Sequence, residues 1–461
     1  MELASLTRVY FIGIGGIGMS AIARYFNHRG VRVAGYDRTR TPLTDELAAE
    51  GIAVHYTARP AAIPPPADDV LVVWTPAIPA DFPELVHVRT HGHHLLKRAE
   101  VLGAISRHQR CIGVAGTHGK TTTTTFTTYL MTAAGLDPSA FLGGIARDFA
   151  GNYVHGHSDW VVVEADEYDR SFLQLSPEIA VVLSVDPDHL DIYGDHGTML
   201  ETGFRAYARR IKPGGQLIVR HDLTNHFSDQ GDVLLTTYGI GRGDFAALNV
   251  RVAEGAFHFD LKEPDGHLIP GLRTGLPGRH NVENAVAACA VTRLAGGSEE
   301  ALRAGLANFS GIARRFETVH RGGPNAPVII DDYAHHPTEL AAAIDAAREL
   351  YPGRRLTGVF QPHLFSRTQD FAAGFARALD ALDEAILIPI YPAREEPIPG
   401  VSSKLVFDQM QLGARRLLSD EQMLAAVGEL TDGVLLLLGA GDIDALVRRI
   451  VAAREKTIHH G

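Results

Sequence analysis

Apolar runs and amphipathic patterns alternate along the first hundred residues. The apolar run at 8–15 precedes the 3.6-residue pattern of a helix at 17–30, and Gly30 ends that pattern. Residues 68–78 form a further strand candidate, and residues 93–108 carry the pattern of a helix. This succession predicts a βαβ arrangement with a parallel sheet.

The same alternation restarts twice in the remaining chain. A second region contains buried-type strands at 110–117, 159–167 and 178–186 and ends with a helix at 281–296. A third region begins near Arg314, where apolar runs are again followed by turns or helices. We therefore predict an α/β protein of three domains, with boundaries at 1–107, 108–313 and 314–461.

The composition is that of a folded protein, since 45% of the 461 residues are hydrophobic and 21% are charged. A formal net charge of −11 argues against a nucleic acid partner held by general electrostatics. The longest apolar runs, such as 433–440, are far shorter than the roughly 20 residues that cross a bilayer, so we expect no membrane insertion. Two cysteines without CxxC spacing and an N-terminus without a signal pattern favour the cytoplasm.

A glycine-rich loop stands between the first strand and the first helix. Gly13, Gly15 and Gly18 form the pattern G-x-G-x-x-G around Gly16, and Asp37 follows the next strand. The amides at such a helix N-terminus bind a pyrophosphate, and the carboxylate binds ribose hydroxyls. The loop therefore predicts a nucleoside diphosphate, which includes NAD, FAD and a UDP-sugar equally.

A second glycine-rich segment, GTHGKTT at 116–122, joins a strand to a helix. Gly116, Gly119, Lys120 and Thr121 match the phosphate loop of ATP enzymes, although the full pattern needs glycine at position 114, where this chain has valine. In such loops the lysine neutralises the β and γ oxygens, and the threonine hydroxyl holds Mg²⁺. Two phosphate-binding loops make an ATP-dependent reaction on a nucleotide-linked substrate the leading prediction.

Acidic and imidazole groups follow other predicted strands. Glu164 and His189 lie at strand ends, where open α/β sheets place their ligands, and they favour a metal site together with Thr121.

Polar groups also gather at the join of the second and third regions: His280, Asn281 and Asn284 begin a helix, and Asp332 and His335 follow a strand. These groups are able to contact adenine and ribose, although a structural role is the commoner one for such histidines.

The chain resembles the Mur ligases of peptidoglycan assembly over its whole length. The resemblance is carried, in order, by GIGGIGMSA, GTHGKTTTT, EADEYDRSFL, DHLD, HNVENA, RRFE, DDYAHHPTE, FQPHLFSRT and GAGDI. It implies an N-terminal Rossmann-like domain for UDP-N-acetylmuramate, a central P-loop-like ATPase domain and a C-terminal Rossmann-like domain for the amino acid. The implied reaction is the ATP-dependent ligation of L-alanine to the lactyl carboxylate of the sugar nucleotide, through an acyl phosphate.

The resemblance also implies roles for residues at matching positions. The UDP part would be held by Gly13, Gly15, Gly16, Gly18 and Asp37. ATP would be bound by Gly116, Thr117, His118, Gly119, Lys120, Thr121, Thr122, His280, Asn281, Asn284, Arg315 and Asp332. Mg²⁺ would lie on Thr121, Glu164 and His189, and L-alanine among Tyr333, His335, His363 and Arg367. Lys120 is the expected catalytic residue of phosphoryl transfer, and His335 or His363 is the expected proton acceptor.

Three positions depart from the family pattern. Position 364 is leucine where some relatives have a second arginine, and Trp74 stands in WTPAI where Ser-Ser-Ala-Ile is expected. No lysine occurs between His189 and Lys212, where several sister ligases have a carbamylated lysine.

Other activities stay open at this point. A recycling ligase that adds a tripeptide to the same sugar nucleotide shares most motifs, although FQPHLFSRT favours the amino-acid enzyme. An NAD-dependent oxidoreductase would need only the first glycine loop, but it leaves the Lys120 loop unexplained. Glycine or L-serine as the acceptor, a non-enzymatic ATP-binding regulator and the oligomeric state are open as well.

Overall fold

The computed structural model describes residues 3–188, 190–229, 231–323, 326–393 and 395–458. It divides into two compact units. The first consists of Met1–Asn249, Asp260–Leu272 and Glu283–Phe309, and the second of Val250–Phe259, Arg273–Val282 and Ser310–Gly461.

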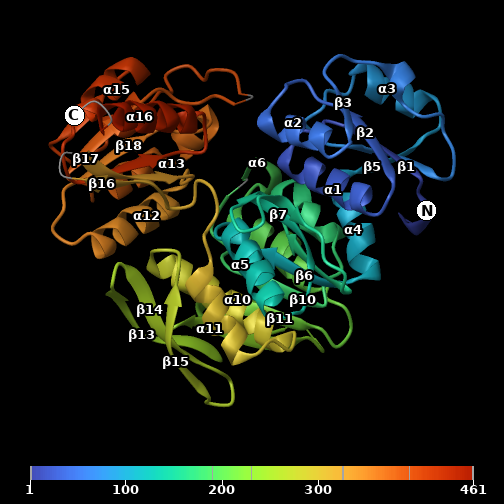
Figure 1. Ribbon diagram of the computed structural model, residues 1–461, viewed down its shortest axis with the longest axis horizontal. Coiled ribbons are helices and arrows are strands. Elements are labelled where there is room, and N and C mark those ends of the chain that lie inside the picture. Colours follow the sequence, from blue (N-terminus) through green and yellow to red (C-terminus); the bar gives the residue numbers. More distant parts are fainter. Residues whose placement is uncertain (1–2, 189, 230, 324–325, 394, 459–461) are drawn as a thin grey trace. The chain divides into compact units, whose positions relative to one another are not determined.

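The N-terminal region of the first unit is built on a parallel sheet with the strand order β3-β2-β1-β4-β5 (Figure 1). Its elements are η1 (Leu3–Ser5), β1 (Arg8–Ile12), α1 (Ile17–His28), β2 (Arg32–Tyr36), α2 (Pro42–Ala49), β3 (Ala53–His55), η2 (Pro60–Ala62), β4 (Val70–Trp74), α3 (Pro83–Thr90), β5 (His94–Lys97) and α4 (Arg98–His108). Side chains of β1 alternate between two cores. Val9 and Phe11 pack in one, with residues of α1 and α4, and Tyr10 and Ile12 pack in the other, with residues of α3.

The predicted helix at 93–108 is wrong at its start, because residues 94–97 form β5 and pair with β4. A short apolar run such as HLLK fits a strand or a helix equally, and the open edge of β4 decides for the strand. The helix itself begins at Arg98.

The central region carries a ten-stranded sheet of order β15-β14-β13-β12-β11-β10-β6-β9-β7-β8. Its first elements are β6 (Arg110–Ala115), α5 (Lys120–Ala133), β7 (Ser139–Ala146), β8 (Gly151–Val154), β9 (Trp160–Glu164), η3 (Tyr168–Gln174), β10 (Ile179–Val182), α6 (Leu190–Tyr193), α7 (His196–Met199), η4 (Leu200–Arg205) and α8 (Ala206–Ala208). The others are β11 (Gln216–Arg220), η5 (His221–Leu223), α9 (Thr224–Phe227), β12 (Leu234–Ile240), β13 (Phe245–Ala253), β14 (Ala256–Lys262), β15 (Leu268–Thr274), α10 (Arg279–Leu294) and α11 (Glu299–Asn308). Sequence reasoning did not foresee β13 and β15, whose exposed positions weaken the apolar signal, or β14, in which buried and half-buried positions alternate.

The second unit is an α/β layer structure on the sheet β16-β17-β21-β18-β19-β20, parallel except for the pair β16 and β17 (Figure 1). Its elements are β16 (Glu317–Gly323), β17 (Ala326–Asp332), α12 (Pro337–Leu350), β18 (Leu356–Phe360), α13 (Phe365–Leu379), β19 (Glu384–Leu387), α14 (Lys404–Phe407), β20 (Arg415–Leu417), α15 (Asp420–Gly428), β21 (Val434–Leu438) and α16 (Ile443–Ile458). One hydrophobic core lies between the sheet and helices α12 and α13, and a second lies between the sheet and helices α15 and α16. Both faces of the sheet are therefore covered.

The prediction of three α/β domains is confirmed by these three sheets. The residue boundaries proposed from the sequence stay predictions. The first two regions share one hydrophobic core, which runs from Phe26 of α1 to Phe141 of β7, and this is why they form a single compact unit.

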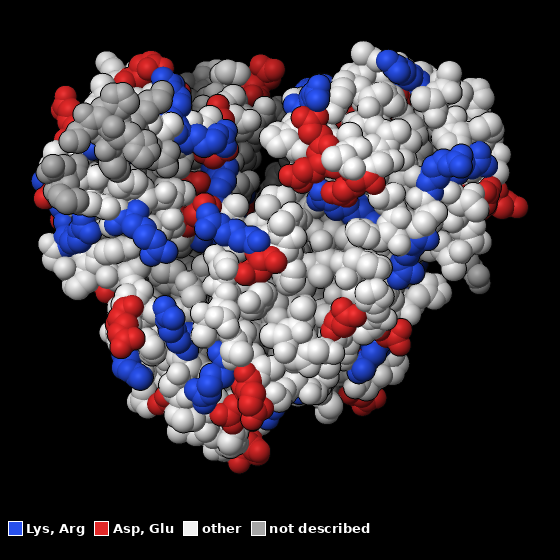
Figure 2. All heavy atoms as spheres, viewed as in Figure 1, with Lys and Arg blue, Asp and Glu red and all other residues white. Residues whose placement is uncertain are grey.

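Three properties of the described residues bear on the classes of protein that the composition argued against. No helix among the described residues is long and apolar enough to cross a membrane. The face of the molecule in Figure 2 shows acidic and basic side chains intermixed. Both cysteines are buried free thiols, and burial raises the pKa of Cys111 to about 12.

Candidate active site

The glycine loop connects β1 to α1 in a conformation that requires glycine at positions 13 and 15. Gly13 has a φ of +92°, and its amide donates to the carbonyl of Tyr36 at 2.8 Å. A Cβ on Gly15 would lie 2.8 Å from the Oδ2 atom of Asp37. Gly16 is the N-cap of α1, and a Cβ there would meet no atom nearer than 3.7 Å.

Asp37 lies beside this loop, as the sequence predicted, but its carboxylate is engaged with the backbone. Its Oδ2 atom accepts from the amide of Gly15 at 2.8 Å, and its Oδ1 atom accepts from the amide of Thr39 at 3.1 Å. Asp37 therefore shapes the loop, and the role of both in UDP binding stays a prediction.

The lysine loop connects β6 to α5 and is held by the end of β10. Gly116 and Gly119 have φ values of +142° and +80°, and a Cβ on Gly116 would lie 2.9 Å from the amide nitrogen of Ser184. The Ser184 hydroxyl oxygen accepts from the amide of His118 at 2.9 Å and shares a hydrogen bond of 2.9 Å with the Thr117 hydroxyl. The loop is thus preformed, with its shape set by a neighbouring strand end.

Lys120 forms a buried ion pair that sequence reasoning missed. Its ammonium group donates to the Oε1 and Oε2 atoms of Glu167 at 2.8 and 2.7 Å and to the carbonyl of Gly116 at 2.7 Å. The side chain of Glu167 has no exposed surface, and that of Lys120 is 14% exposed. Burial acts to lower the pKa of Lys120, but the carboxylates of Glu167, Asp166 and Glu164 outweigh it and raise that pKa.

The pair keeps the ammonium group charged and fixed next to the loop. Glu167 lies in the segment EADEYDRSF, which the sequence singled out, but neither its spacing nor its type distinguishes it from Glu164 or Asp166.

The predicted metal ligands are only partly placed. Glu164 ends β9, and a Cβ on Gly143 of β7 would lie 2.2 Å from its Oε2 atom, so the carboxylate lies against a bare backbone position. Thr121 begins the buried face of α5. His189 lies outside the described residues. Oxygen donors beside a phosphate loop suit Mg²⁺, which is commonly held by one or two protein groups and by substrate phosphates.

The threonines that follow Lys120 serve the packing of α5. Thr122 to Thr125 are buried, and the hydroxyls of Thr125, Thr128 and Thr132 donate to carbonyls one turn earlier at 2.7 to 2.8 Å. Such back-bonding satisfies buried hydroxyls in a helix whose β-branched residues have low propensity. Thr122 therefore has a packing role in addition to its predicted contact with ATP.

Asn284 is close to the lysine loop, as predicted for an ATP contact. A Cβ on Gly119 would lie 2.7 Å from its Oδ1 atom. Within the second unit, burial lowers the pKa of His280 to about 4, and Asn281 donates to the carbonyl of Pro277 at 2.7 Å. At physiological pH this favours the neutral ring of His280, in which one nitrogen donates and the other accepts a hydrogen bond.

Asp332 ends β17 and organises the loop before β16. Its Oδ2 atom accepts from the amide of Phe316 at 2.7 Å, and its Oδ1 atom accepts from the amide of Ala334 at 2.7 Å. Burial raises its pKa to about 6, although Arg315 opposes this shift. The guanidinium group of Arg315 lies 5.0 Å from the ring centre of Tyr333.

The predicted amino-acid residues form a row of rings in the second unit. The ring centres of Tyr333 and His335 are 5.4 Å apart, and those of His335 and His363 are 6.1 Å apart. His335 Nδ1 lies 3.0 Å from the carbonyl of Tyr333, and because a carbonyl only accepts, this nitrogen carries the proton. In the neutral ring, Nε2 is then the proton acceptor. Arg367 lies in the first turn of α13, after Leu364 with its φ of +68°.

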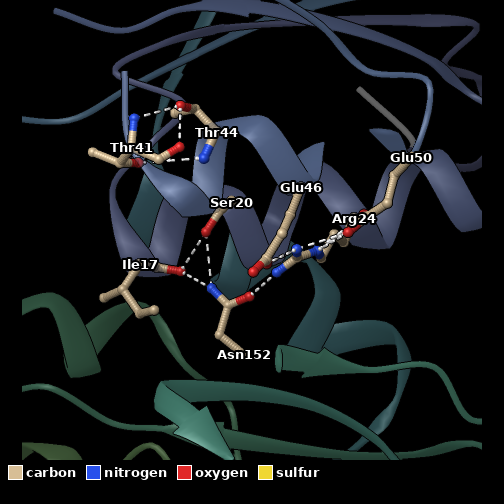
Figure 3. A network of polar contacts seen from close by, with 8 residues as sticks. All are labelled: Ile17, Ser20, Arg24, Thr41, Thr44, Glu46, Glu50 and Asn152. Carbon is tan, nitrogen blue, oxygen red and sulfur yellow. Dashed lines mark hydrogen bonds and ion pairs between the residues drawn. The ribbon is translucent and has the colours of Figure 1, made fainter. Parts of the chain in front are cut away.

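A buried polar network joins the helix after the glycine loop to the central region (Figure 3). Asn152 of β8 donates to the hydroxyl of Ser20 at 2.8 Å and to the carbonyl of Ile17, and its side-chain oxygen accepts from Arg24. Arg24 is 5% exposed and pairs with Glu46 and Glu50 at 3.0 and 2.7 Å. The network fixes α1 on the region that carries the lysine loop, and a lone asparagine in a strand gave no signal for it.

Comparisons with known protein families match the chain along its length. A model of the Mur ligase family catalytic domain matches residues 8–110, one of the Mur ligase middle domain matches 114–292, and one of the Mur ligase glutamate ligase domain matches 314–443. The chain belongs to the Mur ligase family. The family resemblance stated from the motifs is confirmed, and so is the class of the enzyme, an ATP-dependent amide ligase rather than a nicotinamide oxidoreductase.

Individual Mur ligases agree with this membership. The UDP-N-acetylmuramate–L-alanine ligase of Porphyromonas gingivalis is 47% identical over 450 residues, which are 96% of this chain and 98% of that protein. The structure of UDP-N-acetylmuramate-alanine ligase from Thermotoga maritima has a TM-score of 0.80 at 28% identity and covers 98% of this chain and 99% of its own. A murein peptide ligase of Psychrobacter arcticus shares the fold, with a TM-score of 0.70 at 22% identity, over 97% of this chain and 98% of its own.

Proposed function

We propose that this Mur ligase joins L-alanine to the lactyl carboxylate of UDP-N-acetylmuramate in peptidoglycan precursor synthesis, with ATP converted to ADP and phosphate. The observation that carries the proposal is the pair of preformed anion loops in one compact unit, in a chain similar over its full length to ligases of that name. One loop fits the UDP diphosphate and the other fits the triphosphate of ATP.

The carboxylate needs activation, because an oxide is too poor a leaving group for direct attack by an amine. In the first step the lactyl oxygen attacks the γ-phosphorus, the bond to the β-bridging oxygen breaks, and an acyl phosphate and ADP form. Lys120, held charged by Glu167, stabilises the negative charge that spreads over the transferred phosphoryl group. Thr121, Glu164 and His189 would hold Mg²⁺, which would supply further positive charge to the phosphates.

In the second step the neutral amine of L-alanine attacks the acyl carbon, and phosphate leaves. We place the amino acid beside Tyr333, His335 and His363, with its carboxylate on Arg367. His335 is the better proton acceptor, because its Nδ1 proton is directed at the Tyr333 carbonyl and Nε2 then carries the lone pair.

The remaining nucleotide contacts are assigned as the sequence predicted them. The adenine and ribose contacts are His280, Asn281, Asn284 and Asp332, and Arg315 lies near the phosphates.

Water would hydrolyse the acyl phosphate, so we propose that the C-terminal domain closes before chemistry. We also propose that the enzyme works in the cytoplasm, where its nucleotide substrates are available.

The test is phosphate release by the purified protein with UDP-N-acetylmuramate, ATP and one acceptor at a time. L-Alanine is expected to give the highest kcat/KM, ahead of glycine and L-serine, since a methyl or hydroxyl group is worth about 1–3 kcal/mol in a pocket. Faster turnover with the L-alanyl-γ-D-glutamyl-meso-diaminopimelate tripeptide would contradict the proposal. Removal of Mg²⁺ by a chelator is expected to abolish release in every arm.

A further inference from the structure

The first turn of α13 is bound by a carboxylate from another part of the second unit. Glu395, which follows β19, accepts from the amide of Ser366 at 3.0 Å through Oε2 and from the Ser366 hydroxyl through Oε1. Burial acts to raise the pKa of Glu395, but hydrogen bonds from Ser366 and from the amide of Phe365 outweigh it and lower that pKa. Glu395 is therefore ionised at neutral pH.

The helix start itself provides no such group. The N-cap of α13 is Leu364, which has no side-chain hydrogen bond to the helix, and the first turn holds no acidic residue. Amides at a helix start need acceptors, and the helix dipole favours negative charge there. Glu395, 29 residues after Ser366, supplies both the acceptor oxygens and the charge.

Leu364 has a strained backbone. Its φ of +68° and ψ of +141° form a combination that glycine adopts readily and other residues rarely. The amide of Leu364 donates to the carbonyl of Tyr391 at 3.0 Å, and the amide of Tyr391 donates to the carbonyl of Pro362 at 2.9 Å. Because such strain persists only where the surrounding contacts hold it, Tyr391 and Glu395 together keep this turn in place.

The strained turn lies between two residues of the proposed L-alanine site. His363 precedes Leu364, and Arg367 lies in the first turn of α13. The rings of His363 and Tyr391 are stacked, with centres 5.8 Å apart and an interplanar angle of 18°. A different conformation of residue 364 would therefore change the direction of His363 relative to Arg367.

We propose that Glu395 is a positioning residue for the amino acid, because it holds the turn at Leu364 in its strained conformation. The turn in turn directs His363 and Arg367 toward the same substrate. This rests on the proposed function, which places L-alanine beside these two residues. Glu395 acts through α13, since both of its carboxylate oxygens accept hydrogen bonds from Ser366.

The experiment measures the KM for L-alanine, ATP and UDP-N-acetylmuramate in Glu395→Gln, which keeps the size of the side chain and removes its charge. The KM for L-alanine is expected to rise about tenfold, in line with the loss of hydrogen bonds to a charged group, and the other two KM values should stay within about twofold. Glu396→Gln, at the exposed next residue, is the matched control and should change none of the three.

The Leu364→Gly background separates positioning from a general structural role. Glycine adopts this backbone conformation without strain, so the turn needs less support there. Glu395→Gln is therefore expected to raise the KM for L-alanine less when it is compared with Leu364→Gly than when it is compared with the wild type.

Three outcomes overturn the inference: an unchanged KM for L-alanine in folded Glu395→Gln, an equal rise of all three KM values, or the same rise in the Leu364→Gly background. If Glu395→Gln does not fold, as judged by thermal unfolding, Ser366→Ala decides, because it removes one hydrogen bond and keeps the carboxylate. It is then expected to raise the KM for L-alanine alone, by less than tenfold. A wild-type protein that does not use L-alanine would instead contradict the proposed function, and the inference would fail with it.

Discussion

Each of the two glycine-containing loops of the first unit connects a strand to a helix, but the charged side chain that lies at each loop is different. In the Lys120 loop the cation belongs to the motif, and buried Glu167 holds it in place at 2.7 Å. In the Gly13–Gly18 loop no residue is basic, and the charged group beside it is the carboxylate of Asp37, which accepts from the amide of Gly15 at 2.8 Å.

The difference matches what each loop has to do. In the proposed function the lysine loop stabilises charge that moves during phosphoryl transfer, so its cation must be fixed before the reaction. In the proposed function the glycine loop only holds a diphosphate that does not react, so backbone amides at a helix N-terminus are sufficient there. Changes at the first loop should therefore alter substrate binding, and changes at the second should alter chemistry.

The largest effect is expected for Lys120→Ala. Loss of the ammonium group removes a main source of transition-state charge stabilisation and is expected to lower kcat by about 100- to 1,000-fold. Calorimetry should show UDP-N-acetylmuramate binding nearly unchanged, because its loop lies elsewhere. A parallel loss of sugar-nucleotide binding would show that the two loops are not separate in function.

Glu167→Gln sharpens the role of the buried carboxylate. Only Asp166 and Glu164 then oppose the effect of burial at Lys120, so its pKa is lower than in the wild type and the alkaline limb of the kcat profile is expected to move down in pH. Breaking one side of a buried pair is also expected to cost about 3–5 kcal/mol of unfolding free energy. In urea unfolding, the double variant Lys120→Met with Glu167→Gln should recover part of that unfolding free energy. An unchanged pH profile of kcat in Glu167→Gln would contradict the role of Glu167 in keeping Lys120 charged.

Gly15→Ala and Gly16→Ala test the first loop as a matched pair. A Cβ at Gly15 collides with the Asp37 carboxylate, whereas Gly16 has room and a φ of −65° that alanine tolerates. Gly15→Ala is expected to raise the KM for the sugar nucleotide about tenfold, in line with a local strain of about 1–2 kcal/mol, and to leave the KM for ATP unchanged. The Gly16→Ala variant should be as stable as the wild type. Any weaker UDP binding would then show how closely the diphosphate approaches the backbone at position 16.

The smallest catalytic effect is expected for Asn152→Ala, which changes the buried polar network of Figure 3 and leaves both loops intact. Arg24 and the Ile17 carbonyl lose a buried partner, at a cost of about 1–3 kcal/mol in unfolding free energy. Affinity for each nucleotide alone should stay within about twofold, while kcat falls several-fold because the two loops are held less firmly. A matched change at half-buried Asn27→Ala, which removes a single hydrogen bond to the carbonyl of Glu50, should leave kcat unchanged.

Much of the architecture could be predicted from local patterns. Gly30 ends the first helix as expected, since α1 stops at His28 and Gly30 has a φ of +76°. Predictions failed where the local signal was weak or ambiguous, at β5 and at the partly exposed strands β13 and β15. The threonine run after Lys120 has low helix propensity, yet it forms a helix because the burial of its side chains outweighs that propensity.

By itself, the sequence determined the class of fold, the two anion loops and the membership in a ligase family, because apolar periodicity and glycine spacing are properties of neighbouring residues. Only the tertiary structure decided which carboxylate meets Lys120 and which side chain joins α1 to the central region. Those partners come from separate strands and helices, and the packing of a shared core brings them together.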